Sequence, residues 1–202
     1  WDDTYVPDRG RVLDAEDLAK IASFHRYDDE DADFVTPRTP PGVSPKGAYF
    51  TRGSGHTREG AYTETPDEYQ AVVDRLARKH HMAAERVPEP VVEFRDDARI
   101  GVVTVGGCDL AVREALLELS ARGIVTDYMR VRGFPFGATV QQFLDDHELL
   151  FVIEQNRDAQ LRSLLVLETT VAKDKLRSVL VYGGYPLSAD DVIDSISAQL
   201  GS

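Results

Sequence analysis

The stretches Ile100-Gly101-Val102-Val103-Thr104-Val105 and Leu149-Leu150-Phe151-Val152-Ile153 are short, almost continuously apolar and rich in β-branched residues. Such runs are typical of strands that are buried on both faces of a sheet. Between them, 110–122 carries apolar residues at helical spacing, and Gly123 is placed to end that helix. An apolar strand, an amphipathic helix and a second apolar strand predict a parallel sheet covered by helices on both faces.

The same alternation continues to the end of the chain. We expect further strands at 91–94, 127–131 and 178–182, helices at 140–147 and 159–169, and a last helix capped by Ser188. The helix at 159–169 is apolar on more than one side, which predicts burial against both the sheet and a neighbour. The predicted fold class is therefore α/β, a three-layer α/β/α sandwich with a mostly parallel five-stranded sheet, over 65–202.

Residues 1–64 differ from the rest and predict an extended arm. Five of the ten prolines lie between Pro7 and Pro45, and 28–33 is an acidic run. Prolines interrupt helices and central strands, so we expect only one short helix here, within 14–24. The arm is either a disordered linker or a segment that docks on another surface, and its apolar side chains favour docking. A capped helix, with Thr65, Pro66 and Glu68 at its start, opens the second domain.

Composition limits the classes of function. The chain of 202 residues has 35 acidic and 23 basic side chains, a net charge of −12, which disfavours nucleic-acid and anionic membrane surfaces as partners. A single cysteine, Cys108, excludes disulfide scaffolds, thiolate zinc sites and cysteine-ligated clusters. No run is long enough to span a bilayer and no secretory signal is present, so we expect a cytoplasmic protein. The missing initiator Met suggests that the numbering starts inside a longer polypeptide.

Ligands of open α/β sheets gather at the carboxyl ends of the strands, where the winding direction reverses. If the strand at 100–105 is central, 127–131 lies on one side of it and 149–153 and 177–181 lie on the other. The crevice then falls between Gly106-Gly107 and the polar cluster 154–158. The glycines either approach an anion or form a tight turn, and the cluster either caps a helix or contacts a ligand.

Three other motifs each have two interpretations. The elbow 132–137, with its Phe134-Pro135-Phe136 core, either plugs the sheet edge or is an apolar knob for a subunit contact. The glycine-laced loop Arg52-Gly53-Ser54-Gly55-His56 either binds an anion or is a plain connector. The adjacent His80 and His81 point different ways on a helix, so we expect a solvated pair and no metal site. No complete catalytic set emerges from these residues.

Taken together and in order, several motifs resemble the C-terminal part of the alpha subunit of 2-oxoacid:ferredoxin oxidoreductases, which is a transketolase C-terminal-like domain. They are the segment Tyr49-Phe50-Thr51-Arg52-Gly53-Ser54-Gly55-His56, the strand and elbow at 127–136, the segment 152–161 and the loop 182–187. The form Glu154-Gln155-Asn156-Arg157-Asp158-Ala159-Gln160-Leu161 is most similar to the 2-oxoglutarate branch.

The resemblance implies an enzyme that decarboxylates a 2-oxoacid on thiamine diphosphate, passes electrons through [4Fe-4S] clusters to ferredoxin and hands the acyl group to coenzyme A. It also implies that the partners of this chain are the alpha subunit's own N-terminal domains and the beta subunit. In the family the beta subunit largely holds the diphosphate, Mg²⁺ and the cluster. This chain lacks the pyrimidine-binding domain and its activating glutamate, so we expect it to be structural, to bind no cofactor and to be inactive alone.

No residue is therefore expected to be catalytic or to bind a metal. The candidates for facing partner domains or substrate are Arg52, Gly53, Ser54, Gly55, His56, Gly106, Gly107, Phe134, Pro135, Phe136, Glu154, Asn156, Arg157 and Gln160. One alternative is a transketolase-like domain reused as a scaffold or regulatory module without redox chemistry. Another is a small-ligand binder at the crevice between Gly106 and Asn156.

Overall fold

The computed structural model describes residues 3–29, 33–51 and 53–201. The chain divides into two compact units, Trp1–Met82 and Ala83–Ser202, here named the arm–helix unit and the α/β unit. The sequence predicts a domain boundary at 64/65, before the helix Pro66–Ala83. The contacts instead group most of this helix with the arm. Among the described residues, no helix combines the length and the apolar character needed to cross a bilayer.

The α/β unit contains one sheet of five strands in the order β1-β3-β2-β4-β5. The strands are β1 (Val91–Glu93), β2 (Ile100–Val105), β3 (Thr126–Val131), β4 (Leu149–Glu154) and β5 (Leu176–Leu180). All neighbours pair in parallel except β1, which runs antiparallel to β3 at the edge. The predicted mostly parallel sheet, with β2 at its centre, is confirmed.

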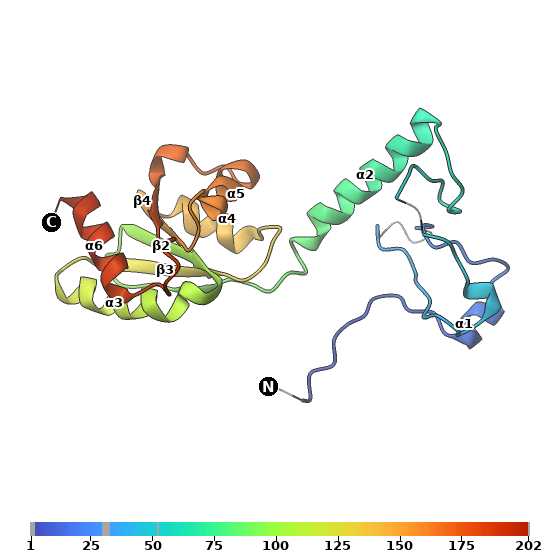
Figure 1. Cartoon of the computed structure of the whole chain (residues 1–202), viewed down its shortest axis with the longest axis horizontal. Coiled ribbons are helices and arrows are strands. Elements are labelled where there is room, and N and C mark those ends of the chain that lie inside the picture. The colour runs from blue at the N-terminus through green and yellow to red at the C-terminus, as the bar shows by residue number, and fades with distance from the viewer. Residues whose placement is uncertain (1–2, 30–32, 52, 202) are drawn as a thin grey trace. The chain divides into compact units, whose positions relative to one another are not determined.

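Helices cover both faces of this sheet, α3 and α6 on one and α4 and α5 on the other (Figure 1). Their bounds are α3 (Asp109–Ala121), α4 (Ala138–Asp145), α5 (Gln160–Glu168) and α6 (Ala189–Leu200). Ser188 and Asp191 form a capping box at the start of α6. The three-layer α/β/α sandwich is therefore confirmed.

The two faces of the sheet carry separate apolar cores because side chains alternate along each strand. On β4, Phe151 and Ile153 join the core under α3 and α6, whereas Leu150 and Val152 join the core under α4 and α5. All four side chains are fully buried. Two-sided burial explains why this strand is apolar at every position rather than at every second one.

The burial of α5 against the sheet is confirmed, whereas burial of its outer side against a neighbour stays a prediction. Leu161 and Leu165 are buried against the sheet, but Leu167 on the outer side of the helix is 76% exposed. Each face of the sheet carries one layer of helices, so that the outer side of α5 has no second layer to pack against within the α/β unit. The apolar residues on the outer side of α5 are therefore not explained by packing within the α/β unit.

The arm–helix unit contains little regular structure apart from α2 (Pro66–Ala83). The short helix is α1 (Ala15–Lys20), narrower than the expected 14–24, with an Asp14–Asp17 capping box at its start. Leu18 packs against Gly47 and Thr39, and the Thr39 hydroxyl donates to the carbonyl oxygen of Gly47 at 2.7 Å. Within the described part of this unit, Leu18 is the one apolar side chain that is buried.

Candidate functional site

The two segments that are expected to line a crevice are neighbours at the carboxyl ends of β2 and β4. Strand β2 has β3 on one side and β4 on the other, so that the segments after β2 and β4 are neighbours. The Cys108 thiol lies 3.9 Å from Oε1 of Gln155 and joins the two segments. Gly106 and Gly107 are exposed, and a Cβ added to either would meet nothing within 4 Å. The backbone at this edge is therefore open to a partner or ligand.

Glu154, at the end of β4, is 1% exposed and caps the N-terminus of α5 with its carboxylate. Oε2 accepts from the backbone N–H of Leu161 at 2.7 Å, and Oε1 accepts from that of Arg162 at 3.1 Å. The side-chain amide of Asn156 also donates to Oε2, at 2.7 Å. The first backbone N–H groups of a helix have no partner within the helix, and a carboxylate satisfies them while complementing the helix dipole.

Asn156 completes this arrangement from the loop. Its Oδ1 accepts from the backbone N–H groups of Asp158 at 3.1 Å and of Gln160 at 3.2 Å. Of the two interpretations of this cluster, the capping one describes Glu154 and Asn156. Because Glu154 already supplies a negative charge to the N-terminus of α5, an external anion would meet an occupied position there. The side chains of Arg157 and Gln160 are exposed at the same edge.

A second polar network, which the sequence analysis did not single out, surrounds Asp109 at the start of α3. The Tyr128 hydroxyl donates to Oδ1 at 2.6 Å, and the guanidinium groups of Arg113 and Arg130 bind Oδ1 and Oδ2 at 2.9 and 3.2 Å. The hydrogen bond from Tyr128, assisted by both guanidinium groups, lowers the pKa of Asp109. Burial and the same hydrogen bond raise the pKa of Tyr128. The i, i+4 spacing of Asp109 and Arg113 was a signal for this pair.

The sequence analysis also missed a buried pair formed by Asp127 and His147. His147 Nε2 lies 3.0 Å from Asp127 Oδ2, and His147 Nδ1 lies 2.6 Å from the carbonyl oxygen of Phe143. Asp127 Oδ1 accepts from the backbone N–H of Arg95 at 2.7 Å. The pair connects the start of β3, the end of α4 and the turn after β1, so that its role is to tie elements of the fold together. No local spacing announces it, because the partners are distant in sequence.

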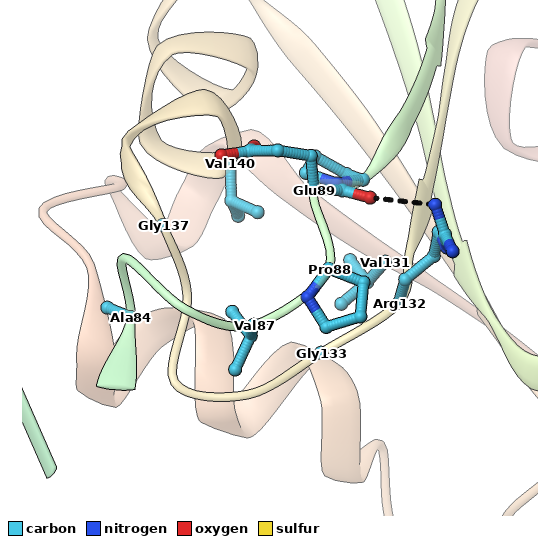
Figure 2. A pocket seen from close by; sticks show the side chains of 10 residues that line it. Ala84, Val87, Pro88, Glu89, Val131, Arg132, Gly133, Gly137 and Val140 are labelled. Atoms are coloured by element: carbon cyan, nitrogen blue, oxygen red, sulfur yellow. Dashed lines mark hydrogen bonds between the residues drawn. The ribbon is translucent and has the colours of Figure 1, made fainter. Parts of the chain in front are cut away.

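The elbow after β3 receives the segment that follows α2 (Figure 2). A Cβ on Gly133 would stand 2.7 Å from Cβ of Val87, so that only glycine allows this approach. Arg132 also donates to the carbonyl oxygen of Glu89, at 3.5 Å. The pocket left between the two segments measures about 10 Å³, which is room for at most one water molecule. This niche anchors the chain and does not bind a ligand.

The aromatic pair of the elbow is divided between core and surface. Phe136 packs against the core under α4, and the ring of Phe134 meets it edge to face with the centroids 5.2 Å apart. Phe134 itself is 42% exposed, next to the half-buried Pro135. The elbow thus places Phe136 against the core beyond the end of β3 and presents the ring of Phe134 at the surface.

The glycine-laced loop lies in the arm–helix unit, and Arg52 falls outside the described residues. Gly53 and Ser54 are exposed, whereas a Cβ on Gly55 would stand 2.7 Å from the carbonyl oxygen of Thr63. The His56 ring stacks on Tyr27 at 3.9 Å between centroids, and its Nδ1 lies 2.9 Å from the carbonyl oxygen of Thr57. His56 is therefore held by packing and is not presented with Ser54 as a reactive pair.

The described residues offer no ligand set for the metal ion or the iron–sulfur cluster that the sequence resemblance implies. Across 3–29, 33–51 and 53–201, no group of three or more His, Cys, Asp or Glu side chains is placed to hold a metal ion. Cys108 is buried, and one thiolate cannot ligate a four-iron cluster. No step of chemistry through such a group can be assigned to these residues.

Two comparisons with known proteins bear on identity, while no protein-family model matches the chain. The chain is 25% identical over 196 residues to the 2-oxoacid:ferredoxin oxidoreductase subunit alpha of Saccharolobus solfataricus, covering 95% of the chain and 30% of that relative. It also superposes, with a TM-score of 0.76 and 23% identity, on a structure of the 2-oxoglutarate:ferredoxin oxidoreductase from Magnetococcus marinus with 2-oxoglutarate, coenzyme A and succinyl-CoA bound. That superposition covers 90% of this chain and 31% of the other.

The chain thus spans about a third of the length of the proteins that it matches. The superposed structure is 23% identical, so it supports the fold of this chain. The sequence match extends over both units. The resemblance found in the sequence motifs is confirmed: over nearly its whole length this chain is similar in sequence to the alpha subunit of a 2-oxoacid:ferredoxin oxidoreductase.

Proposed function

We propose that this chain is the C-terminal, structural part of the alpha subunit of a cytoplasmic 2-oxoacid:ferredoxin oxidoreductase. The observation that carries the proposal is the sequence match to such a subunit over 95% of the chain, through the arm as well as the sandwich. The collinear order of the motifs at 49–56, 127–136, 152–161 and 182–187 is consistent with that match.

The chain supplies a scaffold, and the reaction takes place on other polypeptide segments. Thiamine diphosphate would supply the electron sink for decarboxylation, and a [4Fe-4S] cluster the path to ferredoxin. Glu154 and Asn156, the polar groups at the crevice, are already bound within the fold. We assign Gly106, Gly107, Arg157 and Phe134, which are exposed in the α/β unit, to contacts with partner domains or with coenzyme A.

We further propose 2-oxoglutarate as the 2-oxoacid. The support is the form of the segment 154–161 and the substrate named for the Magnetococcus marinus structure, which shares the fold of this chain.

The test is to purify the oxidoreductase that contains this chain through an affinity tag on the chain, and to measure ferredoxin reduction. We expect reduction that requires both coenzyme A and 2-oxoglutarate, with pyruvate at least tenfold less effective, and no reduction by the 202-residue chain alone. Equal activity with pyruvate would remove the substrate assignment. An active isolated chain would overturn the structural role.

A further inference from the structure

Helix α2 has two different faces, and the arm occupies one of them. Glu68, Val72 and Arg75 line a hollow together with Tyr27 and Phe34 of the arm. Arg75 donates to the carbonyl oxygen of Phe34 at 3.3 Å, and the Arg78 guanidinium lies 5.2 Å from the centroid of the Phe34 ring. This face of the helix therefore already has a partner within the chain.

The other face carries an apolar stripe that is exposed to solvent. Tyr69, Val73 and Leu76 recur at the i, i+4, i+7 spacing of one helix face, and they are 56%, 45% and 49% exposed. One edge of the Tyr69 ring borders the arm at Gly55, where an added Cβ would stand 3.1 Å from Cδ2. The helix runs for 18 residues and contains no buried residue. In water, helices obtain most of their stability from packing an amphipathic face, so an exposed stripe of this kind indicates a missing partner.

The size of the relatives indicates which partner is missing. The chain accounts for 30% of the length of its Saccharolobus relative, so that about two thirds of that alpha subunit has no counterpart here. A stripe of large apolar side chains at this spacing fits an apolar groove on a protein surface. A nucleic acid or an anionic lipid surface fits poorly, because the whole chain carries a net charge of −12.

We infer that the stripe Tyr69–Val73–Leu76 is a docking surface for an apolar groove on the remaining part of the alpha subunit. This inference rests on the proposed function, and it adds the helix face that makes the contact. In this arrangement the arm packs on one face of α2, and the remaining part of the alpha subunit covers the stripe. Exposure of the stripe is a property of the chain when it is separated from that part.

The test compares hydrogen–deuterium exchange of α2 in the chain alone and in the tagged, assembled oxidoreductase. We expect exchange in the α2 peptides to be at least tenfold slower in the assembly. Equal exchange in the two samples overturns the inference, and so does strong protection in the chain alone, which would mean that the stripe packs within the chain itself or on a second copy. Sedimentation of the chain alone separates those two outcomes.

Matched variants locate the contact on the helix. Val73→Lys adds one positive charge to the stripe, and Gln70→Lys adds the same charge to a position about 60° outside it on the helix. With the remaining part of the alpha subunit expressed as a separate polypeptide, we expect Val73→Lys to reduce its recovery on the tagged chain about tenfold, a change of about 1.4 kcal/mol, with Gln70→Lys close to wild type. Equal recovery with both variants overturns the inference. An unchanged helix content of the chain by circular dichroism shows that neither variant acts by unfolding α2.

The proposed function and this inference fail in different ways. If the tagged chain recovers no 2-oxoacid-dependent ferredoxin reduction at all, the proposed function falls and the inference falls with it. If the assembly is active while α2 exchanges as fast as in the chain alone, only the inference is overturned.

Discussion

The two units of this chain differ in how much apolar side-chain surface they bury. The α/β unit buries its apolar side chains in two cores, one on each face of a five-stranded sheet. The arm–helix unit buries one apolar side chain among its described residues, Leu18, and is otherwise shaped by the Asp14–Asp17 capping box, side-chain hydrogen bonds and the Arg58–Asp28 ion pair. Hydrogen bonds and partly exposed ion pairs each contribute little net stability, so we expect the α/β unit to be the more stable of the two.

The difference teaches that sequence likeness to an enzyme subunit does not make every part of a chain self-sufficient. The α/β unit resembles an independent domain. The arm–helix unit keeps large apolar side chains at its surface, among them Phe50 at 73% and Tyr62 at 53% exposure. Such a surface is expected of a segment that is completed by another polypeptide.

The sharpest test of this comparison replaces one buried leucine by alanine in each unit. Leu116 and Leu18 are both 1% exposed. Leu116→Ala leaves a cavity in the α/β core and is expected to lower the free energy of unfolding of that unit by about 2 to 5 kcal/mol. Leu18→Ala is expected to leave it within about 0.5 kcal/mol of wild type and to accelerate proteolysis within 1–82. Urea denaturation and limited proteolysis measure both effects. A large loss from Leu18→Ala would mean that the units fold as one.

The next largest effect concerns the crevice. Glu154→Ala removes the acceptor of the Leu161 and Arg162 backbone N–H groups and is expected to cost about 1 to 3 kcal/mol. Arg157→Ala in the same loop should change the free energy of unfolding by no more than about 0.5 kcal/mol, because its ion pair with Asp158 is exposed. Thermal denaturation of both variants checks the difference. Indistinguishable variants would show that Glu154 is not a cap and would return it to the ligand-binding candidates.

A third test concerns the anchor between the elbow and the segment after α2. Gly133→Ala pushes a methyl group against Val87 and is expected to destabilise the α/β unit by about 1 to 3 kcal/mol. Gly183→Ala has open space around the added Cβ and should stay within about 0.5 kcal/mol of wild type. Hydrogen exchange of 84–90 should rise in the first variant alone. Unchanged exchange there would mean that this segment is not held by the elbow.

The smallest effect is a pH dependence. The pKa of Asp109 is lowered in the folded chain, chiefly by the Tyr128 hydroxyl, so its contribution to stability is present above the ordinary carboxyl pKa and is lost as the pH falls below it. We expect Asp109→Asn to be less stable than wild type at pH 7 and to lose less stability than wild type between about pH 5 and pH 3. Asp191→Asn removes another carboxyl group of lowered pKa, and its stability is measured over the same pH range for comparison. Parallel pH profiles for Asp109→Asn and wild type would contradict the assignment.

The sequence alone determined the architecture of the α/β unit. The apolar runs at 100–105 and 149–153, the helical spacing between them and the rule of right-handed crossovers were sufficient to predict the central strand and its neighbours. These features could be predicted because they depend on periodicity and chain order, which are local properties. The family resemblance followed for the same reason, because short motifs keep their order along the chain.

Only the tertiary structure decided what the polar side chains do. Glu154 could cap a helix or meet a ligand, and the difference depends on whether the N–H groups of Leu161 and Arg162 return to its carboxylate. The Asp127–His147 pair and the contact of Gly133 with Val87 join residues that are far apart in sequence. A hydrogen bond or a close approach depends on distances of a few tenths of an ångström between distant segments, and no local pattern of residues encodes such distances.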